Sequence, residues 1–560
     1  MKKIVGLLLW GGLLFNYFAA KAQYFYFYPP YGGAPPQFSD AALLFSRTNP
    51  GGSARIQAMG GAQVSLGGDY SSAFSNPAGL GMYNHSEFTF SLGVNSSNTS
   101  SIYNNATTTT ASTSNFLPIT GISLVFHNKK NNGKLLGGTL GLSLNRINDF
   151  NSTFEYQGVN TNNSIIDFFL ADANNTSSLN GGLGPGNLFY TATTAGLLYE
   201  SPTRLAYDNY LINPHSPTDS THYTSDVPAN PNNPIQHEIV KTTGYQYQGN
   251  ISYGVNLGDK VFIGGGIGIP FLSYQNTKTY METFGNVPLS SLTMNESLSK
   301  SGTGVNVTLG SIFRPLDFLQ VGLSVVTPTW YSMTDNYSAS LGTNWSPSSF
   351  TTLYPTGVLP TTPSSTDQLT TSYSFVTPWK LSVGATYFIQ KSGFVTADIE
   401  YLDYGTSHYS SPSYQYYYVQ NSNLSFDADN AAIRSDYRSV INFRMGGEYR
   451  LNKFRIRAGY NLMPNPYVQN STDIQIESTI QSFTAGFGYR SEKFFVDLAG
   501  IYTEAGTSTY RRYEGTYNGN LIESPLVTTK TTNTKVMVTV GFTLKDSSGN
   551  RRSRRGMGMY

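Results

Sequence analysis

The sequence contains no cysteine in 560 residues and few charged side chains. The absence of thiols excludes a disulfide framework, thiolate chemistry and a lipidated N-terminal cysteine. Charged residues make up 12% of the chain, whereas ordinary soluble domains carry about 25%. Because the net charge is only +2, the sequence also lacks the basic surface that nucleic-acid binding requires, and we expect no nucleic-acid partner.

Long apolar runs are scarce as well. The run Ile4–Leu14 follows two lysines and precedes Ala20 and Ala22, which form an A-x-A cleavage pattern. Residues 1–22 are therefore predicted to be a cleaved secretory signal. The run is too short to cross a bilayer as a helix, which takes about 20 apolar residues, and no later stretch of the sequence supplies a longer one.

What the chain has instead is alternation. In residues 245–257, mostly tyrosine, isoleucine, valine and leucine occupy every second position, and mostly glutamine, asparagine and serine stand between them. One face of such a strand can lie against lipid while the other lines a wet interior, and about ten residues are enough to cross a bilayer. The mean hydropathy of −0.26 is compatible with this interpretation, because only alternate residues of a barrel strand meet lipid.

Fourteen segments of this kind lie between residues 86 and 545, and their connections alternate strictly between short and long. Short periplasmic turns and long extracellular loops are typical of outer-membrane barrels. The sequence therefore predicts an all-β fold: a transmembrane antiparallel β-barrel of about 14 strands, in the outer membrane of a diderm bacterium, with both termini in the periplasm. A soluble β-sandwich gives no reason for a long loop at every second connection. The short connections are 128–134, 258–260, 315–317, 390–393, 452–453 and 491–493, and the long ones are 96–117, 148–243, 275–300, 331–373, 405–435, 462–477 and 507–532.

Two segments lie outside the predicted barrel, which covers residues 86–545. Residues 23–85 do not alternate and form an N-terminal extension and hatch, in which residues 24–38 are rich in aromatic residues and proline and are expected to be extended. Residues 40–80 suit either a compact plug or a surface segment. The tail 546–560 is basic, and we expect it to lie in the periplasm, either solvated or in contact with an acidic partner protein.

The longest predicted loop, 148–243, contains two apolar stretches that an extracellular loop would have to bury. One interpretation is that the loop folds on itself and caps the barrel. The other is an apolar groove that captures a hydrophobic solute. The candidate capture residues are Phe168, Phe169, Leu170, Phe189 and Tyr190.

Charged side chains gather on the inward faces of neighbouring strands between residues 380 and 457. One interpretation is a ladder of ion pairs that stiffens the wall. The alternative is that one of Arg444, Arg455 and Arg457 is free to bind a fatty-acid carboxylate, because guanidinium and carboxylate match as a bidentate pair. The inward charges are Lys380, Asp398, Glu400, Arg444, Glu448, Arg450, Arg455 and Arg457.

Enzyme and cofactor signatures are weak. His215, His222 and His237 lie in one loop without the spacing of a zinc site. Residues 297–300 spell S-x-x-K without the companion motifs of that chemistry, and residues 427–430 lack the later glycine and glutamate of a calcium loop. We therefore expect no catalytic residues, no metal site and no cofactor.

The N-terminal segment carries a family resemblance. Residues 54–62 read ARIQAMGGA and residues 69–80 read DYSSAFSNPAGL, which resembles the hatch of the FadL-type long-chain fatty-acid and hydrocarbon transporters, with Asn76, Pro77 and Ala78 as its Asn-Pro-Ala motif. Residues 377–384, 444–449 and 455–460 are similar as well. The resemblance implies a fourteen-stranded barrel plugged by its N-terminal segment, hydrophobic solutes captured outside and bound beside the plug, and lateral release into the membrane.

Two functions remain open from the sequence. The leading hypothesis is passive, hatch-gated uptake of hydrophobic small molecules such as long-chain fatty acids or aromatic hydrocarbons, with outer-membrane lipid as the other partner. The alternative is a non-transporting barrel of the same shape that docks protein partners through its long loops or basic tail, for instance in a protein-secretion apparatus.

Overall fold

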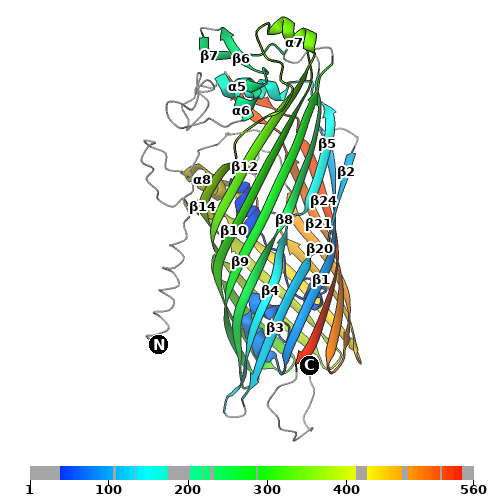
Figure 1. Cartoon of the computed structure of the whole chain (residues 1–560). Coiled ribbons are helices and arrows are strands. Elements are labelled where there is room, and N and C mark those ends of the chain that lie inside the picture. The colour runs from blue at the N-terminus through cyan, green and yellow to red at the C-terminus, as the bar shows by residue number, and fades with distance from the viewer. Residues whose placement is uncertain are drawn as a thin grey trace.

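The computed structural model describes residues 38–104, 109–130, 133–174, 202–216, 219–227, 233–285, 288–410, 426–468, 477–517 and 520–544 (Figure 1). The predicted signal at 1–22, most of the aromatic extension, Phe189, Tyr190 and the basic tail lie outside these residues. The end of the barrel that carries the short connections is called the turn end below, and the opposite end is called the loop end.

A closed barrel of 14 antiparallel strands forms the body of the protein, as the sequence predicts (Figure 1). The alternating segments pair in chain order, and the last strand closes on the first, where Phe542 lies opposite Phe88. Because the barrel is closed, the turn-end half of the wall has no strand with an unpaired edge. The strands are β1 (Ser86–Tyr103), β3 (Ile119–Lys129), β4 (Leu135–Asp149), β8 (Ile235–Leu257), β9 (Val261–Thr283), β10 (Leu289–Leu316), β11 (Leu319–Val326), β15 (Lys380–Ile389), β16 (Gly393–Asp403), β18 (Ser439–Leu451), β19 (Phe454–Met463), β20 (Glu477–Arg490), β21 (Phe494–Tyr510) and β24 (Val527–Leu544).

The longest strands exchange their polar and apolar faces halfway along. On β10, the outward residues Val305, Val307 and Leu309 are exposed and apolar, as contact with lipid requires. Nearer the loop end, the same strand buries Leu292 and Met294 inside and turns serine and threonine outward. The half at the turn end is therefore built for a bilayer, and the half at the loop end is built like a water-soluble barrel.

Additional strands extend the wall at the loop end. Segments that we expect to be loops from the sequence, such as 275–300, are strand for most of their length: β9 runs to Thr283 and β10 begins at Leu289. The polar outward faces of these extensions hide them from an alternation test that looks for apolar outward residues. The extending strands are β2 (Thr109–Phe116), β5 (Ser152–Val159), β12 (Trp330–Trp345), β13 (Ser364–Ser365), β14 (Leu369–Val376) and β17 (His408–Ser410).

The N-terminal segment 38–85, called the hatch below, folds inside the barrel rather than on its surface (Figure 1). It comprises α2 (Phe38–Ser46), α3 (Ala54–Gln57), α4 (Ser72–Ser75) and the 3₁₀ helix η2 (Pro77–Met82). Its chain touches the inner wall at glycines, where a Cβ atom would overlap the hatch. These wall glycines are Gly121, Gly254, Gly264, Gly310, Gly322, Gly446, Gly459 and Gly486.

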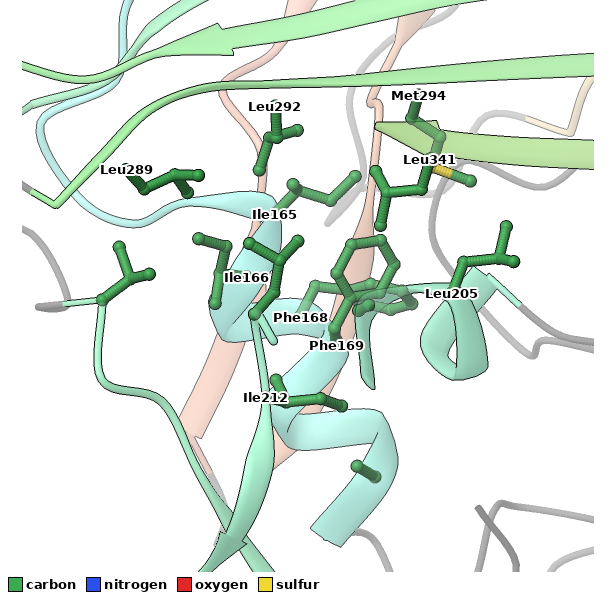
Figure 2. Packing of buried hydrophobic residues seen from close by; sticks show 14 of the residues in the cluster. Ile165, Ile166, Phe168, Phe169, Leu205, Ile212, Leu289, Leu292, Met294 and Leu341 are labelled. Carbon is green, nitrogen blue, oxygen red and sulfur yellow. The ribbon is translucent and has the colours of Figure 1, made fainter. Parts of the chain in front are cut away.

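A helical cap covers the loop end of the barrel, as Figure 1 shows. Phe168 and Phe169 of α5 are buried with Leu205 of α6 against Leu292 of β10 and Leu341 of β12 (Figure 2). The described part of the 148–243 segment therefore folds on itself and caps the barrel. The elements around this core are α5 (Ile165–Asn174), α6 (Pro202–Asp208), the hairpin of β6 (Asn213–Ser216) and β7 (Asp219–Thr224), α7 (Pro347–Leu353), and the hairpin of β22 (Glu514–Tyr517) and β23 (Asn520–Glu523).

Candidate ligand-binding site in the lumen

Helix α2 lies among aromatic side chains in the loop-end half of the lumen. Phe45 and Ala42 are buried, and Phe45 packs edge-on against Phe150 and Tyr274. Phe38, at the start of α2, lies edge-on against Tyr373. This set, called the aromatic cluster below, is an apolar interior that α2 itself fills. Its wall members are Phe150, Leu272, Tyr274, Leu298, Tyr331, Met333, Tyr373, Phe375, Leu402, Tyr404, Tyr409, Val440 and, from α8 (Asp427–Asp436) and the residues flanking it, Phe426, Ile433 and Tyr437.

Three cations lie at the turn-side edge of the aromatic cluster. Arg444 donates from Nη2 to Glu400 Oε1 at 2.6 Å. Lys380 donates to the hydroxyl of Thr48 at 2.6 Å, and Arg47 donates to the hydroxyl of Ser478 at 2.9 Å. Of these three cations, only Arg444 forms an ion pair with a carboxylate among the described residues. Its buried Nε atom has no hydrogen-bond acceptor there.

These cations, called the upper cation group below, adjoin the aromatic cluster because Tyr404 is within electrostatic range of Arg47 and Arg444. Three positive charges lie here beside two carboxylates, those of Glu400 and Asp398. Asp398 already accepts the backbone N–H groups of Gln63 and Val64, at 2.6 and 2.9 Å. The group therefore carries an excess of one positive charge over these two carboxylates.

Asn76 joins the hatch to the barrel wall. Its Nδ2 atom donates to the carbonyl oxygens of Val64, Ser311 and Leu323 at 2.6, 3.2 and 3.3 Å. Its Oδ1 atom accepts from the N–H of Ala78 at 3.2 Å and so caps η2, where Pro77 occupies the first position. The Asn-Pro-Ala motif thus links two parts of the hatch with strands β10 and β11.

The hatch divides the inward charges into two groups. Met59 lies against Gly446 of β18 and Gly459 of β19, so Arg444 is on its loop side and Glu448 on its turn side. The candidate carboxylate-binding arginines separate accordingly: Arg444 belongs to the upper cation group, whereas Arg455 and Arg457 lie below the hatch.

Below the hatch, Glu448 and Asp497 form the ladder of ion pairs that was one interpretation of the sequence. Arg457 bridges both carboxylates, with Nε 2.8 Å from Glu448 Oε2 and Nη1 2.7 Å from Asp497 Oδ1. Arg455 is 3.8 Å from Glu448. The set, called the arginine cluster below, consists of Arg55, Arg450, Arg455, Arg457 and Arg490 around Glu448 and Asp497.

The wall has a side seam at the loop end. Strand β2 pairs with β1 and strand β5 pairs with β8, but no backbone pairing joins β2 to β5 within the described strands. The seam begins near Ile119, which lies opposite Leu92 at the upper edge of the apolar outer face. Leu117, beside it, is 71% exposed.

The hatch covers the inner side of this seam. Asn49 donates its N–H to the carbonyl of Ile147 at 3.0 Å. The Asn148 side chain donates to the carbonyls of Leu44 and Arg47 at 3.2 and 3.1 Å. Movement of the segment 44–49 would therefore be needed to connect the seam with the aromatic cluster.

A second buried ionic network, which the sequence analysis missed, lies beneath the cap. Arg512 is 1% exposed, with Nη1 2.5 Å from Glu296, and Glu238 accepts from the hydroxyl of Tyr156 at 2.7 Å. These residues fall within or at the edges of segments predicted to be loops. The signal that could have located them is the position of Glu296 between Met294 and Leu298 on the inner face of β10.

The cap itself is closed around the candidate capture residues. Phe168 and Phe169 are 6% and 1% exposed, and Leu170 is half-buried against the same core. At the junction of α5 and α6, Thr203 donates to Asp172 at 2.5 Å, and burial raises the pKa of Asp172 above the usual aspartate value. The phenylalanines are thus core residues of the cap in this conformation.

Metal ligation is not supported in the described part of the chain, where no group of three or more His, Asp or Glu residues could hold a metal ion. The rings of His215 and His222 lie 5.8 Å apart, whereas His237 contacts Glu155 at 2.7 Å.

The helices that the structure describes include none long and apolar enough to cross a membrane.

Comparisons with known proteins find similarity in structure only. No protein-family model and no curated protein matches the sequence. Among solved structures, a FadL homologue of Pseudomonas aeruginosa is 12% identical, with 89% of this chain and 98% of that chain covered, at a TM-score of 0.49. The toluene transporter TodX of P. putida is 12% identical, with 89% and 99% covered, at a TM-score of 0.47. The CymD monoaromatic hydrocarbon channel is 12% identical, with 89% and 99% covered, at a TM-score of 0.41.

Proposed function

We propose that this protein is an outer-membrane transporter for passive uptake of a hydrophobic solute that carries a carboxylate, such as a long-chain fatty acid. The observation that carries the proposal is an apolar interior, the aromatic cluster, with the upper cation group at one edge and the hatch closing it toward the turn end. In this arrangement the turn end and both termini face the periplasm, and the loop end faces the exterior.

The apolar interior supplies the driving force for binding. A solute that replaced α2 there would exchange water for aromatic and aliphatic side chains, worth about 25 cal/mol per Å² of apolar surface removed from water. Because α2 fills the cluster, the solute binds as the hatch moves, which couples binding to gating.

The cations favour a carboxylate over a purely aromatic hydrocarbon. A hydrocarbon would leave Lys380 and Arg47 with hydroxyl and carbonyl partners alone. A carboxylate would place its charge beside them, and hydrogen bonds to charged groups are the stronger ones in a buried setting.

The route avoids the cap in its closed conformation. The core around Phe169 and the network around Arg512 close the axial path at the loop end. The side seam beside Ile119 lies at the loop-side edge of the apolar outer face. Side-chain contacts close it, such as the hydrogen bond from the Tyr247 hydroxyl to the Ile119 carbonyl at 2.7 Å. We assign solute exchange with the membrane to the seam, with these contacts as its outer gate and the segment 44–49 as its inner gate.

The test compares two ligands that differ in the head group. Binding of a long-chain fatty acid and of the alcohol of equal chain length is measured on purified protein by native mass spectrometry and competition. Lys380→Gln should weaken binding of the acid by roughly tenfold and leave the alcohol unchanged, whereas Lys391→Gln, at an exposed turn lysine, should change neither. If neither ligand binds the wild-type protein, or if reconstituted vesicles show no uptake, the proposed function is wrong.

A further inference from the structure

The arginine cluster below the hatch carries more positive charge than its own carboxylates neutralise. Five guanidinium groups surround Glu448 and Asp497, an excess of three positive charges. Asp69 also acts on Arg55, but its oxygens already accept hydrogen bonds from Ser53 and Ser71. With Asp69 counted, an excess of two remains.

The existing ion pairs leave donor groups unused. Glu448 accepts hydrogen bonds from Arg450 at 3.0 Å and Arg457 at 2.8 Å. Arg55 and Arg455 approach the same carboxylate only to 3.5 and 3.8 Å, which is beyond a normal hydrogen bond. The Nη1 atom of Arg55 donates to the carbonyl of Gly68, and that of Arg455 donates to the carbonyls of Asn452 and Phe454, so their remaining N–H groups are the unused donors.

One buried donor has no acceptor at all within the described structure. The Arg457 side chain is 0% exposed, and its Nη2 atom has no hydrogen-bond partner. A buried guanidinium N–H that lacks an acceptor costs about 1–3 kcal/mol or more. An additional oxyanion close to this arginine would lower that cost by electrostatic attraction, even without direct contact.

Solvent reaches the cluster from the turn end. The side chains of Arg450 and Arg490 are 20% and 26% exposed, and those of Arg55 and Arg455 are both 13% exposed. Arg55 comes from the hatch, and Arg450, Arg455 and Arg490 come from the turn-end parts of β18, β19 and β20.

We propose that the arginine cluster is a binding site for a small oxyanion, a carboxylate or phosphate group that arrives from the turn end. The planar guanidinium groups of Arg55, Arg450, Arg455 and Arg490 supply forked N–H donors that match such anions. Because Arg55 belongs to the hatch and the others to the wall, the bound anion bridges the two and holds the hatch in place. The proposal is independent of what the aromatic cluster binds.

The experiment measures anion binding to the full-length protein in detergent. Inorganic phosphate and acetate are titrated separately by isothermal calorimetry, with chloride at the same ionic strength as the reference. Saturable binding of either anion is expected. Arg450→Gln combined with Arg490→Gln should weaken it about tenfold or more, and both carboxylates keep Arg457 as partner in this variant.

The matched control removes two positive charges from the turns instead. Lys453→Gln combined with Lys493→Gln, at exposed positions, should leave the affinity within about twofold, because solvent and salt screen exposed charges. Acetate binding alone assigns the site to carboxylates, and phosphate binding alone assigns it to a free phosphate or a lipid head group. No saturable binding, or equal weakening in both double variants, overturns the proposal. Lys380→Gln should not alter this binding, which separates it from the proposed transport function.

Discussion

The glycines of the inner wall allow a sharp test of how the hatch is held. Gly459 lies on β19 beside the hatch backbone, and a Cβ atom there would overlap the carbonyl carbon of Met59 and the nitrogen of Gly60. Both are backbone atoms, so no flexible side chain can move aside. Gly459→Ala should therefore displace the hatch rather than repack around it.

The magnitude follows from two opposing terms. In an open strand position, alanine in place of glycine is favourable by about 0.5–1 kcal/mol, because glycine loses more backbone entropy on folding. Overpacking costs about 1–3 kcal/mol, and contact with two backbone atoms places Gly459→Ala at the upper end. Gly500→Ala on β21 is the matched control, because nothing lies within 4 Å of its Cβ position.

The assay separates the hatch from the barrel. Limited proteolysis should cut the segment 38–85 about tenfold or more faster in Gly459→Ala than in the wild type. The reason is that a net destabilisation of the hatch by roughly 2 kcal/mol raises the population of the locally opened state, which is the state that the protease cleaves. The heat-dependent gel mobility that reports an intact barrel should not change. Equal proteolysis of Gly459→Ala, Gly500→Ala and the wild type would show that the hatch does not depend on close contact with the wall.

Three further substitutions address the hatch anchors and the cap. Asn76→Asp replaces a donor to three carbonyl oxygens by a negative charge, so it should release the hatch, measured as increased single-channel conductance in planar bilayers; unaltered conductance would contradict the anchor role. Asp398→Asn removes the charge that accepts two hatch N–H groups and should weaken hatch protection from hydrogen exchange by about 1.5–3 kcal/mol, whereas Asp259→Asn in an exposed turn should have no effect. Phe169→Ala should destabilise the cap by about 3–5 kcal/mol, seen as rapid proteolysis within the cap and an intact barrel; a cap that stays protected would contradict its assignment to the core.

Much of the turn-end half of the barrel could be predicted, because the alternation of apolar and polar residues is a local property of each strand. Each strand at the turn end needs only its own sequence to turn Val305, Val307 and Leu309 toward lipid, and the six short connections follow from the gaps between such segments. The Asn-Pro-Ala motif was recognised from its family resemblance, and the capping contact between Asn76 and Ala78 lies within the motif.

The loop-end half could not be predicted in the same way. Leu292 and Met294 alternate with serine and threonine just as regularly as residues nearer the turn end, but their apolar face is the inner one. An alternating pattern does not show whether the apolar face of a strand points outward or inward. The apolar face points outward where the strand crosses the bilayer, and it points inward where the cap packs against the inside of the wall.

The partners of the inward charges were likewise undetermined. The sequence placed Arg444, Arg455 and Arg457 on inward faces without showing whether any of them was free. The structure pairs Arg457 with two carboxylates, and the hatch lies between Arg444 and the other two. Such contacts join segments hundreds of residues apart, as Asp398 and Gln63 illustrate.

The sequence by itself thus predicted an antiparallel barrel, because segments with a period of two residues recur along the chain and are joined by alternately short and long connections. The family resemblance of residues 54–62 and 69–80 also predicted that the N-terminal segment plugs the lumen, and a cap was one of two interpretations of the long loop. Only the tertiary structure decided that Phe168 and Phe169 pack into that cap, and that five arginines share two carboxylates below the hatch. These features depend on which distant strands become neighbours, and closure of the barrel settles that.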